Sequence, residues 1–213
     1  DATIRRVFAD HDIPLAPAAE ALTETPIVRF ALDVASLGAE LAWHDVLRVI
    51  RSSYFRAGAL GDFDERTVAA AETLIREGNV QAGSKAYADA AERLAARADR
   101  DSAAGADADD PDADDPRTPR ASSAKPTADE FRQAGAMLGL LFDLSARAAD
   151  PAGLGEAVST LQLAGVACEL GQPELIARDL RALATLGDHL ARLGEPPPPA
   201  DHVRSALSAV ACP

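Results

Sequence analysis

Apolar residues recur every three or four positions along most of this chain, which is the spacing of one face of an α-helix. The clearest run follows Thr25 and Pro26, a possible N-cap and a favoured first residue of a helix. Its apolar positions are Ile27, Phe30, Ala31, Val34, Leu37 and Leu41. Val28 and Leu32 widen the apolar face, so this helix is predicted to be buried on more than one side.

Helical patterns and their end signals continue through the first half of the chain. A shorter helix is predicted over about residues 44–51. Asp62 and Glu65 form a possible capping box for the next helix, which Gly78 is predicted to end. Another helix is predicted to follow Gly83, with its apolar face carried by Tyr87, Ala91 and Leu94.

The second half shows the same organisation. Thr127 and Glu130 form a second capping box, and Gly135 and Gly139 would let a neighbouring helix approach that helix closely. Further helices are predicted over about 150–171, 172–193 and 200–210. Strand evidence is confined to Ile13-Pro14-Leu15, so the predicted fold is all-α, a multi-helix bundle.

Composition divides these helices into two groups. Residues 99–126 are rich in Asp and Pro and contain no apolar residue larger than Ala, so burial cannot offset the entropy of ordering them. This stretch is predicted to be a disordered acidic linker. It separates a first helical part, residues 1–98, from a second, residues 127–213, that is expected to pack on the first.

The overall charge narrows the possible functions. The chain of 213 residues has 34 acidic and 21 basic residues, a net charge of −13, which opposes nucleic-acid binding through bulk charge. Two cysteines form neither a disulfide framework nor a zinc cluster, which favours a reducing, cytoplasmic location. The sequence has no apolar run long enough to span a membrane and no signal peptide.

Candidate chemistry is sparse. The chain has no phosphate-binding loop, no dinucleotide fingerprint and no His-Glu-x-x-His motif, so no catalytic residue, cofactor, metal ligand or small-molecule substrate is predicted. The four histidines do not form ligand-spaced pairs; they are His11, His44, His189 and His202. Cys168 lies on an apolar helix face and is expected to be a small core residue rather than a nucleophile.

One stretch is more basic than its surroundings. Its arginines are Arg29, Arg48, Arg51 and Arg56, with Trp43, Tyr54 and Phe55 interleaved. Arginines and aromatic rings together can follow a nucleic-acid strand by phosphate pairing and base stacking. The alternative is a solvated surface beside an aromatic core, which the nearby acids Asp33, Glu40 and Asp45 favour. If this stretch does bind DNA or a protein partner, these four arginines are the candidate surface.

Three phrases in the first hundred residues resemble a known family. Residues 4–15 resemble the phrase after motif IV of UvrD-like superfamily 1 helicases, with Asp12 where Gly is usual. Residues 24–33 resemble the Thr/Ser-Pro-Leu entry into the inserted helical 2B subdomain of those helicases. Residues 46–55 resemble Leu-Leu-Arg-Ser-Pro-Tyr-Phe, with Ser53 in place of Pro. Together they are similar to AddB-type subunits of helicase–nucleases and related PD-(D/E)XK nuclease-linked proteins.

This resemblance implies a role without catalysis. A 2B-like insertion braces the motor and contacts DNA or a partner helicase–nuclease subunit, whereas the ATPase and nuclease residues of such a protein would lie outside this chain. No position here matches a catalytic motif of the family. We therefore expect a segment from the middle of a longer DNA-repair protein, a reading that the first residue, Asp1, and the apolar end at Pro213 also favour.

A second interpretation stays open. The acid excess and the Leu-rich stretch from Leu175 to Leu193 are also typical of an α-helical protein–protein interaction module with no nucleic-acid role. An extensive exposed apolar patch would favour that interpretation, and a basic groove would favour contact with DNA.

Overall fold

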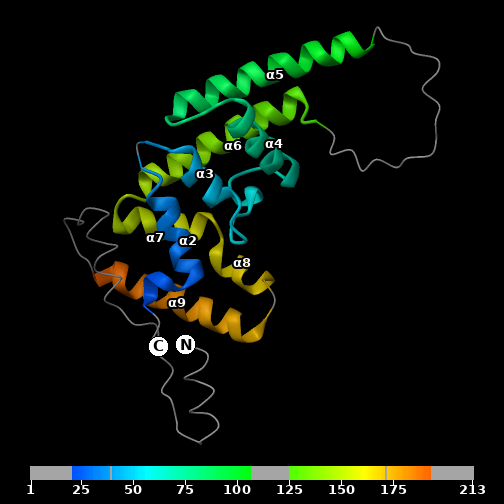
Figure 1. Ribbon diagram of the computed structural model, residues 1–213. Helices are drawn as coiled ribbons and strands as arrows, with labels where there is room; N and C mark the ends of the chain where they lie inside the picture. The colour runs from blue at the N-terminus through cyan, green and yellow to red at the C-terminus, as the bar shows by residue number, and fades with distance from the viewer. Residues whose placement is uncertain (1–20, 39, 107–124, 171, 193–213) are drawn as a thin grey trace, which may run out of the picture.

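A computed structural model describes residues 21–38, 40–106, 125–170 and 172–192 (Figure 1). All regular structure in these ranges is helical, which confirms the all-α prediction for them. The α-helices are α2 (Pro26–Ala35), α3 (Trp43–Ile50), α4 (Glu65–Glu77), α5 (Ser84–Ala106), α6 (Ala128–Arg147), α7 (Pro151–Thr160), α8 (Leu163–Glu169) and α9 (Pro173–Arg192). A short 3-10 turn, η1 (Leu22–Glu24), precedes α2, and a second, η2 (Ala57–Ala59), lies between α3 and α4. The residues predicted to form a last helix and the Ile13-Pro14-Leu15 segment lie outside the described ranges.

Helix α2 has the widespread burial that its sequence predicts. Six of its ten residues are buried, and they are Ile27, Val28, Phe30, Ala31, Leu32 and Val34. Pro26 is the first helical residue, as expected, but the predicted cap is wrong. The Thr25 side chain makes no capping hydrogen bond, and its buried hydroxyl oxygen has no hydrogen-bond partner. Proline, which fixes φ and has no N–H to satisfy, therefore starts this helix without help from the threonine.

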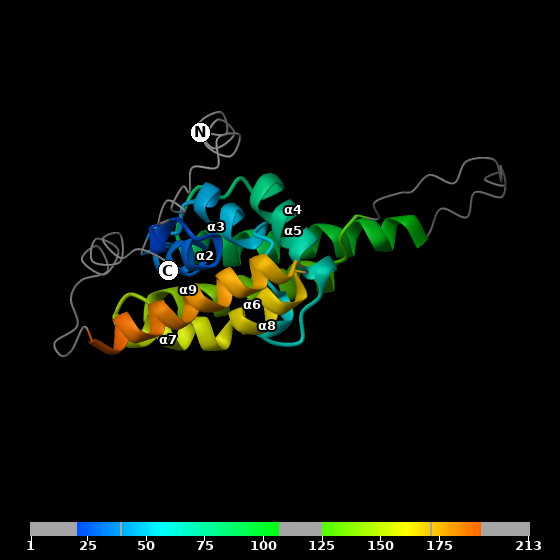
Figure 2. The ribbon, with the colours of Figure 1, turned by 90° about the horizontal axis from the view of Figure 1, so that it is seen from below.

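Helices α4, α5 and α6 form one end of the body. Helix α6 lies along both α5 and α4, and α5 extends beyond the other helices in Figure 2. The predicted close approach is real at Gly135, where an added Cβ would lie 2.8 Å from Cβ of Ala91. At Gly139 an added Cβ would meet nothing within 4 Å, so only the first of the two glycines permits the contact.

Two helix starts can be compared with the capping boxes predicted for them. Thr127 and Glu130 form the predicted capping box at the start of α6. Before α4 the capping box uses Asp64 and Thr67, not the predicted Asp62 and Glu65. Asp64 has the extended backbone that an N-cap requires, and its carboxylate accepts a hydrogen bond from the backbone N–H of Thr67 at 2.9 Å.

The described helices differ from the prediction in one break, in the second half of the chain, and in one boundary, at the end of α5. The helix predicted over about 150–171 is divided into α7 and α8 by Gln162, which has a left-handed backbone with φ of 51°. Helix α9 lies across α2, α7 and α8, so both halves of the sequence contribute to one core. Helix α5 continues to Ala106, so the first residues of the predicted linker range 99–126 are helical; residues 107–124 lie outside the description.

Candidate functional site

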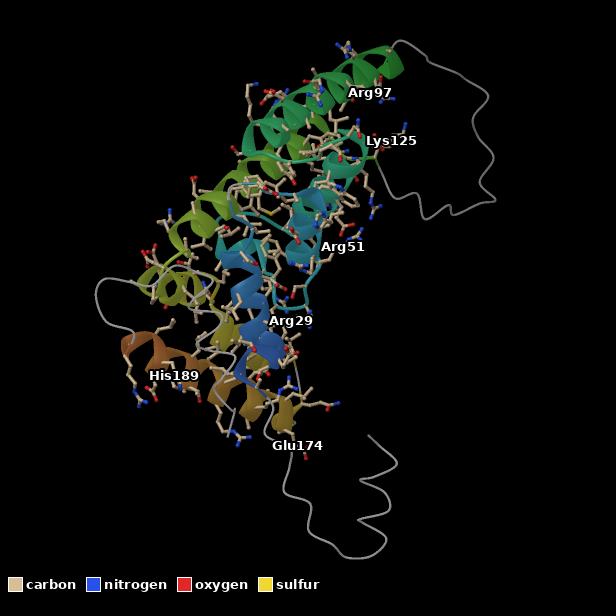
Figure 3. All side chains as sticks on the ribbon, turned by 60° about the vertical axis from the view of Figure 1, so that its left-hand side comes forward. Arg29, Arg51, Arg97, Lys125, Glu174 and His189 are labelled. Atoms are coloured by element: carbon tan, nitrogen blue, oxygen red, sulfur yellow. The ribbon has the colours of Figure 1, made fainter. Side chains whose placement is uncertain are left out.

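Three of the four candidate arginines lie on the exposed sides of α2 and the segment that includes α3. Arg48 is on α3. Arg29, on α2, and Arg51, which directly follows α3, are labelled in Figure 3. Arg29 and Asp33 are four residues apart on α2 and so share a helix face. Arg48 contacts Asp33 across the two helices, with 3.4 Å between Nε and Oδ2. We call this surface, made by Arg29, Asp33, Asp45, Arg48, Arg51, Glu72 and Arg76, the arginine face.

Carboxylates are interposed between the arginines of this face. Arg48 also pairs with Asp45, with 3.0 Å between Nη2 and Oδ1. Arg51 pairs with Glu72 of α4, with 2.7 Å between Nη2 and Oε2, and Arg76 reaches the same oxygen at 3.0 Å. The hydrogen bond from Arg51 lowers the pKa of the Glu72 carboxyl, and the same bond raises the pKa of the Arg51 guanidinium. Both groups therefore stay charged, and four arginines face three carboxylates.

Arg56 is not part of the arginine face. It follows Phe55 in the loop before η2, and its Nε lies 3.5 Å from Oε2 of Glu169 on α8. Its Nη1 also donates to the backbone carbonyls of Ser53 at 2.8 Å and Phe55 at 3.1 Å. The structure thus holds Arg56 against a different part of the surface.

The aromatic residues of the same stretch divide into two kinds. Tyr54 and Phe55 are buried, and the ring of Tyr54 stacks on Phe30 with the centroids 6.1 Å apart. Trp43 is 42% exposed and packs edge-on against the ring of His44. Only Trp43 is therefore accessible for stacking on a base or for contact with a partner.

A buried carboxylate that sequence reasoning missed connects α9 to this region. Asp179 is only 3% exposed, and its Oδ2 accepts a hydrogen bond of 2.7 Å from the hydroxyl of Tyr54. Its Oδ1 accepts two bonds from the neighbouring Arg178, at 2.8 and 2.9 Å. Burial, followed by the bond to Asp179, raises the pKa of Tyr54 to about 12. The signal was present in the sequence, because Asp179 stands at a core position between Ile176 and Leu186.

Comparison of the chain with protein-family models, curated proteins and solved structures finds no match. Its function must therefore be argued from its own residues.

Those residues offer little for catalysis or metal binding within the described ranges. There, no group of three or more His, Cys, Asp or Glu side chains is placed to hold a metal ion. Cys168 is exposed, so its prediction as a core residue is wrong; the buried positions of α8 are Leu163, Val166 and Ala167. His11 and His202 lie outside the described residues.

A helix that crosses a bilayer needs about 20 mostly apolar residues. None of the described helices is both long enough and apolar enough to cross a membrane.

Proposed function

We propose that this chain is a non-catalytic helical segment, similar to a 2B insertion, of an AddB-like ATP-dependent helicase–nuclease in the cytoplasm. In DNA double-strand break repair and recombination it would brace the motor and contact DNA or a partner subunit. No catalytic residue, cofactor or small-molecule substrate is assigned to the chain itself.

The observation that supports the proposal is where two of the three family-like stretches lie in the fold; the stretch over residues 4–15 lies outside the described residues. The phrase over residues 24–33 forms the start of α2, the most extensively buried helix of the first half. The phrase over residues 46–55 forms most of α3 and ends on the buried pair Tyr54 and Phe55. The apolar residues of these two stretches are therefore packing residues, as a bracing element requires, whereas their arginines Arg29, Arg48 and Arg51 are exposed.

The arginine face supports a contact with DNA, but a weak one. Exposed ion pairs such as Arg48 with Asp45 are easily exchanged, so phosphates can compete for these guanidinium groups. The interposed carboxylates and the net charge of −13 oppose that exchange. We therefore expect DNA to bind detectably only at low salt, and more weakly at physiological salt than the roughly 10⁻⁴ to 10⁻⁶ M of typical non-specific complexes.

The test is a titration of the chain into fluorescein-labelled single-stranded and duplex DNA, followed by fluorescence anisotropy at low salt. Replacing Arg29, Arg48, Arg51 and Arg56 together by Ala should weaken binding by about tenfold or more and reduce its dependence on salt. A matched control replaces four exposed arginines elsewhere, Arg66, Arg93, Arg97 and Arg100. If the first variant binds no more weakly than the control variant, the assignment of the four arginines is wrong.

A second candidate function is a protein–protein interaction module with no role in nucleic-acid binding. It is favoured by the ion pairs of Arg48, Arg51 and Arg56, and by exposed apolar side chains. Large apolar residues exposed on the described surface include Trp43, Leu140, Leu170, Leu175 and Leu180. The same titration separates the two candidates, since this one predicts no DNA binding by the unmodified chain even at low salt.

A further inference from the structure

A groove of about 400 Å³ lies between the segment that follows α3 and helix α8. One wall is formed by residues 55–59 and by the start of α4 with the residue pair before it. The other wall is one face of α8 and the turn before it, where Gln162, Gly165 and Glu169 follow at helical spacing. The two walls come from sequence segments about a hundred residues apart and meet only in the folded chain.

The floor of the groove is apolar, and the space at Gly165 is open. Phe55, Leu161 and Val166 are buried residues that line it. At Gly165 an added Cβ would meet nothing within 4 Å, so the space directly above α8 is open. The volume lies within the range of about 300–1,000 Å³ that is usual for binding pockets. The groove can therefore accept an apolar side chain of leucine or phenylalanine size.

The rim of the groove is acidic. Asp64, Glu65 and Glu169 line it, and Arg56 is the single basic residue among those that line it. Hydrogen bonds from the backbone and hydroxyl of Thr67 lower the pKa of Asp64, so this carboxylate stays ionised. Arg56 is engaged with Glu169 and with two backbone carbonyls. The rim thus carries three negative charges against one positive charge.

We propose that this groove binds a basic segment of a partner polypeptide. One apolar side chain of that segment enters above Gly165, and flanking lysine or arginine side chains meet Glu65 and Glu169. Charge complementarity identifies the partner, because the acidic rim and the net charge of −13 attract cations and repel acidic peptides and nucleic acid. The inference goes beyond the proposed function: the groove shares only Arg56 with the four candidate arginines and does not require a DNA-repair parent.

Two glycine variants give a matched test of the groove. Gly165→Leu fills the open space above α8, whereas Gly187→Leu adds the same side chain to α9, outside the groove, at a position that is also open. Both replacements favour the helix, so both chains are expected to fold, which circular dichroism checks. The probe is a short fluorescein-labelled peptide in which lysines flank a central pair of leucines.

The expected result is saturable binding of this peptide that Gly165→Leu weakens about tenfold or more and Gly187→Leu leaves unchanged. Glu65→Gln with Glu169→Gln should weaken binding about two- to fivefold and reduce its salt dependence.

Three outcomes would overturn the proposal. The first is absence of binding, or equal binding by both leucine variants. The second is equal affinity for a peptide with glutamates in place of the lysines. The third is a dimer of the unmodified chain that Gly165→Leu converts to a monomer in sedimentation, because a second copy would then occupy the groove.

Discussion

The hydroxyl of Tyr54 provides a direct measure of how the two halves of the sequence are held together. It donates to Asp179 of α9, which is 125 residues away in the sequence. Tyr54→Phe removes this hydroxyl and keeps the ring that stacks on Phe30, so it creates no large cavity. The variant leaves one oxygen of a buried carboxylate without its tyrosine partner, while Arg178 still pairs with the other oxygen.

The expected loss of unfolding free energy depends on the charge of the group that accepts the hydrogen bond. A hydrogen bond to a charged group contributes about 1.5–3 kcal/mol, and a bond between neutral groups about 0.5–1.5 kcal/mol. Tyr87 supplies the matched control, since its buried hydroxyl donates at 2.8 Å to the neutral backbone carbonyl of Leu41. Urea denaturation followed by circular dichroism at neutral pH should therefore show that Tyr54→Phe lowers the free energy of unfolding more than Tyr87→Phe does.

The pH dependence gives an independent check. The pKa of Tyr54 rises from 10.0 to about 12, so folding favours its neutral form. The stability that this provides is fully present below pH 10 and is lost as the pH rises from 10 to 12. The original chain should therefore lose stability relative to Tyr54→Phe over this pH interval, because Tyr54→Phe has no phenol to ionise. The reasoning is refuted if Tyr54→Phe costs no more than Tyr87→Phe, or if the difference between Tyr54→Phe and the original chain persists unchanged at pH 12.

Two further stability predictions follow from the helices. Gly139→Ala should raise the free energy of unfolding by about 1 kcal/mol, because alanine has a higher helix propensity than glycine. Gly135→Ala should lower it, because the added Cβ would lie 2.8 Å from Cβ of Ala91 and overpacking costs about 1–3 kcal/mol. Equal effects in urea denaturation would contradict the close approach of α5 and α6. Thr127→Ala should cost about 1 kcal/mol, since it removes the cap whose hydroxyl accepts from the Glu130 backbone N–H at 3.2 Å; an unchanged denaturation midpoint would contradict it.

Much of the fold could be predicted because its signals are local. The capping box of Thr127 and Glu130 lies within one helical turn, and the Asp150–Pro151 start of α7 is equally local. The division between α7 and α8 could not be predicted in this way. It depends on a left-handed backbone at Gln162, and glutamine is a good helix former, so no local signal in the sequence indicates the break.

The candidate site was predictable only in part. Sequence proximity grouped Arg56 with the other three arginines, but the loop before η2 directs it to Glu169 of α8. The pairing of Arg51 with Glu72 and of Tyr54 with Asp179 joins residues from distant segments, and no periodicity in the sequence specifies such pairs. The groove beside Gly165 was missed for the same reason, since its two walls are brought together only by the tertiary fold.

The most direct test of the account removes the carboxylates of the arginine face and keeps its arginines. Asp33→Asn, Asp45→Asn and Glu72→Gln together release Arg48, Arg51 and Arg76 from their ion pairs and make the surface more basic. If this face contacts DNA in the parent protein, the triple variant should bind single-stranded DNA several-fold more tightly than the original chain at low salt, with a steeper dependence on salt. Affinity that does not change, in a variant that circular dichroism shows to be folded, would contradict the account.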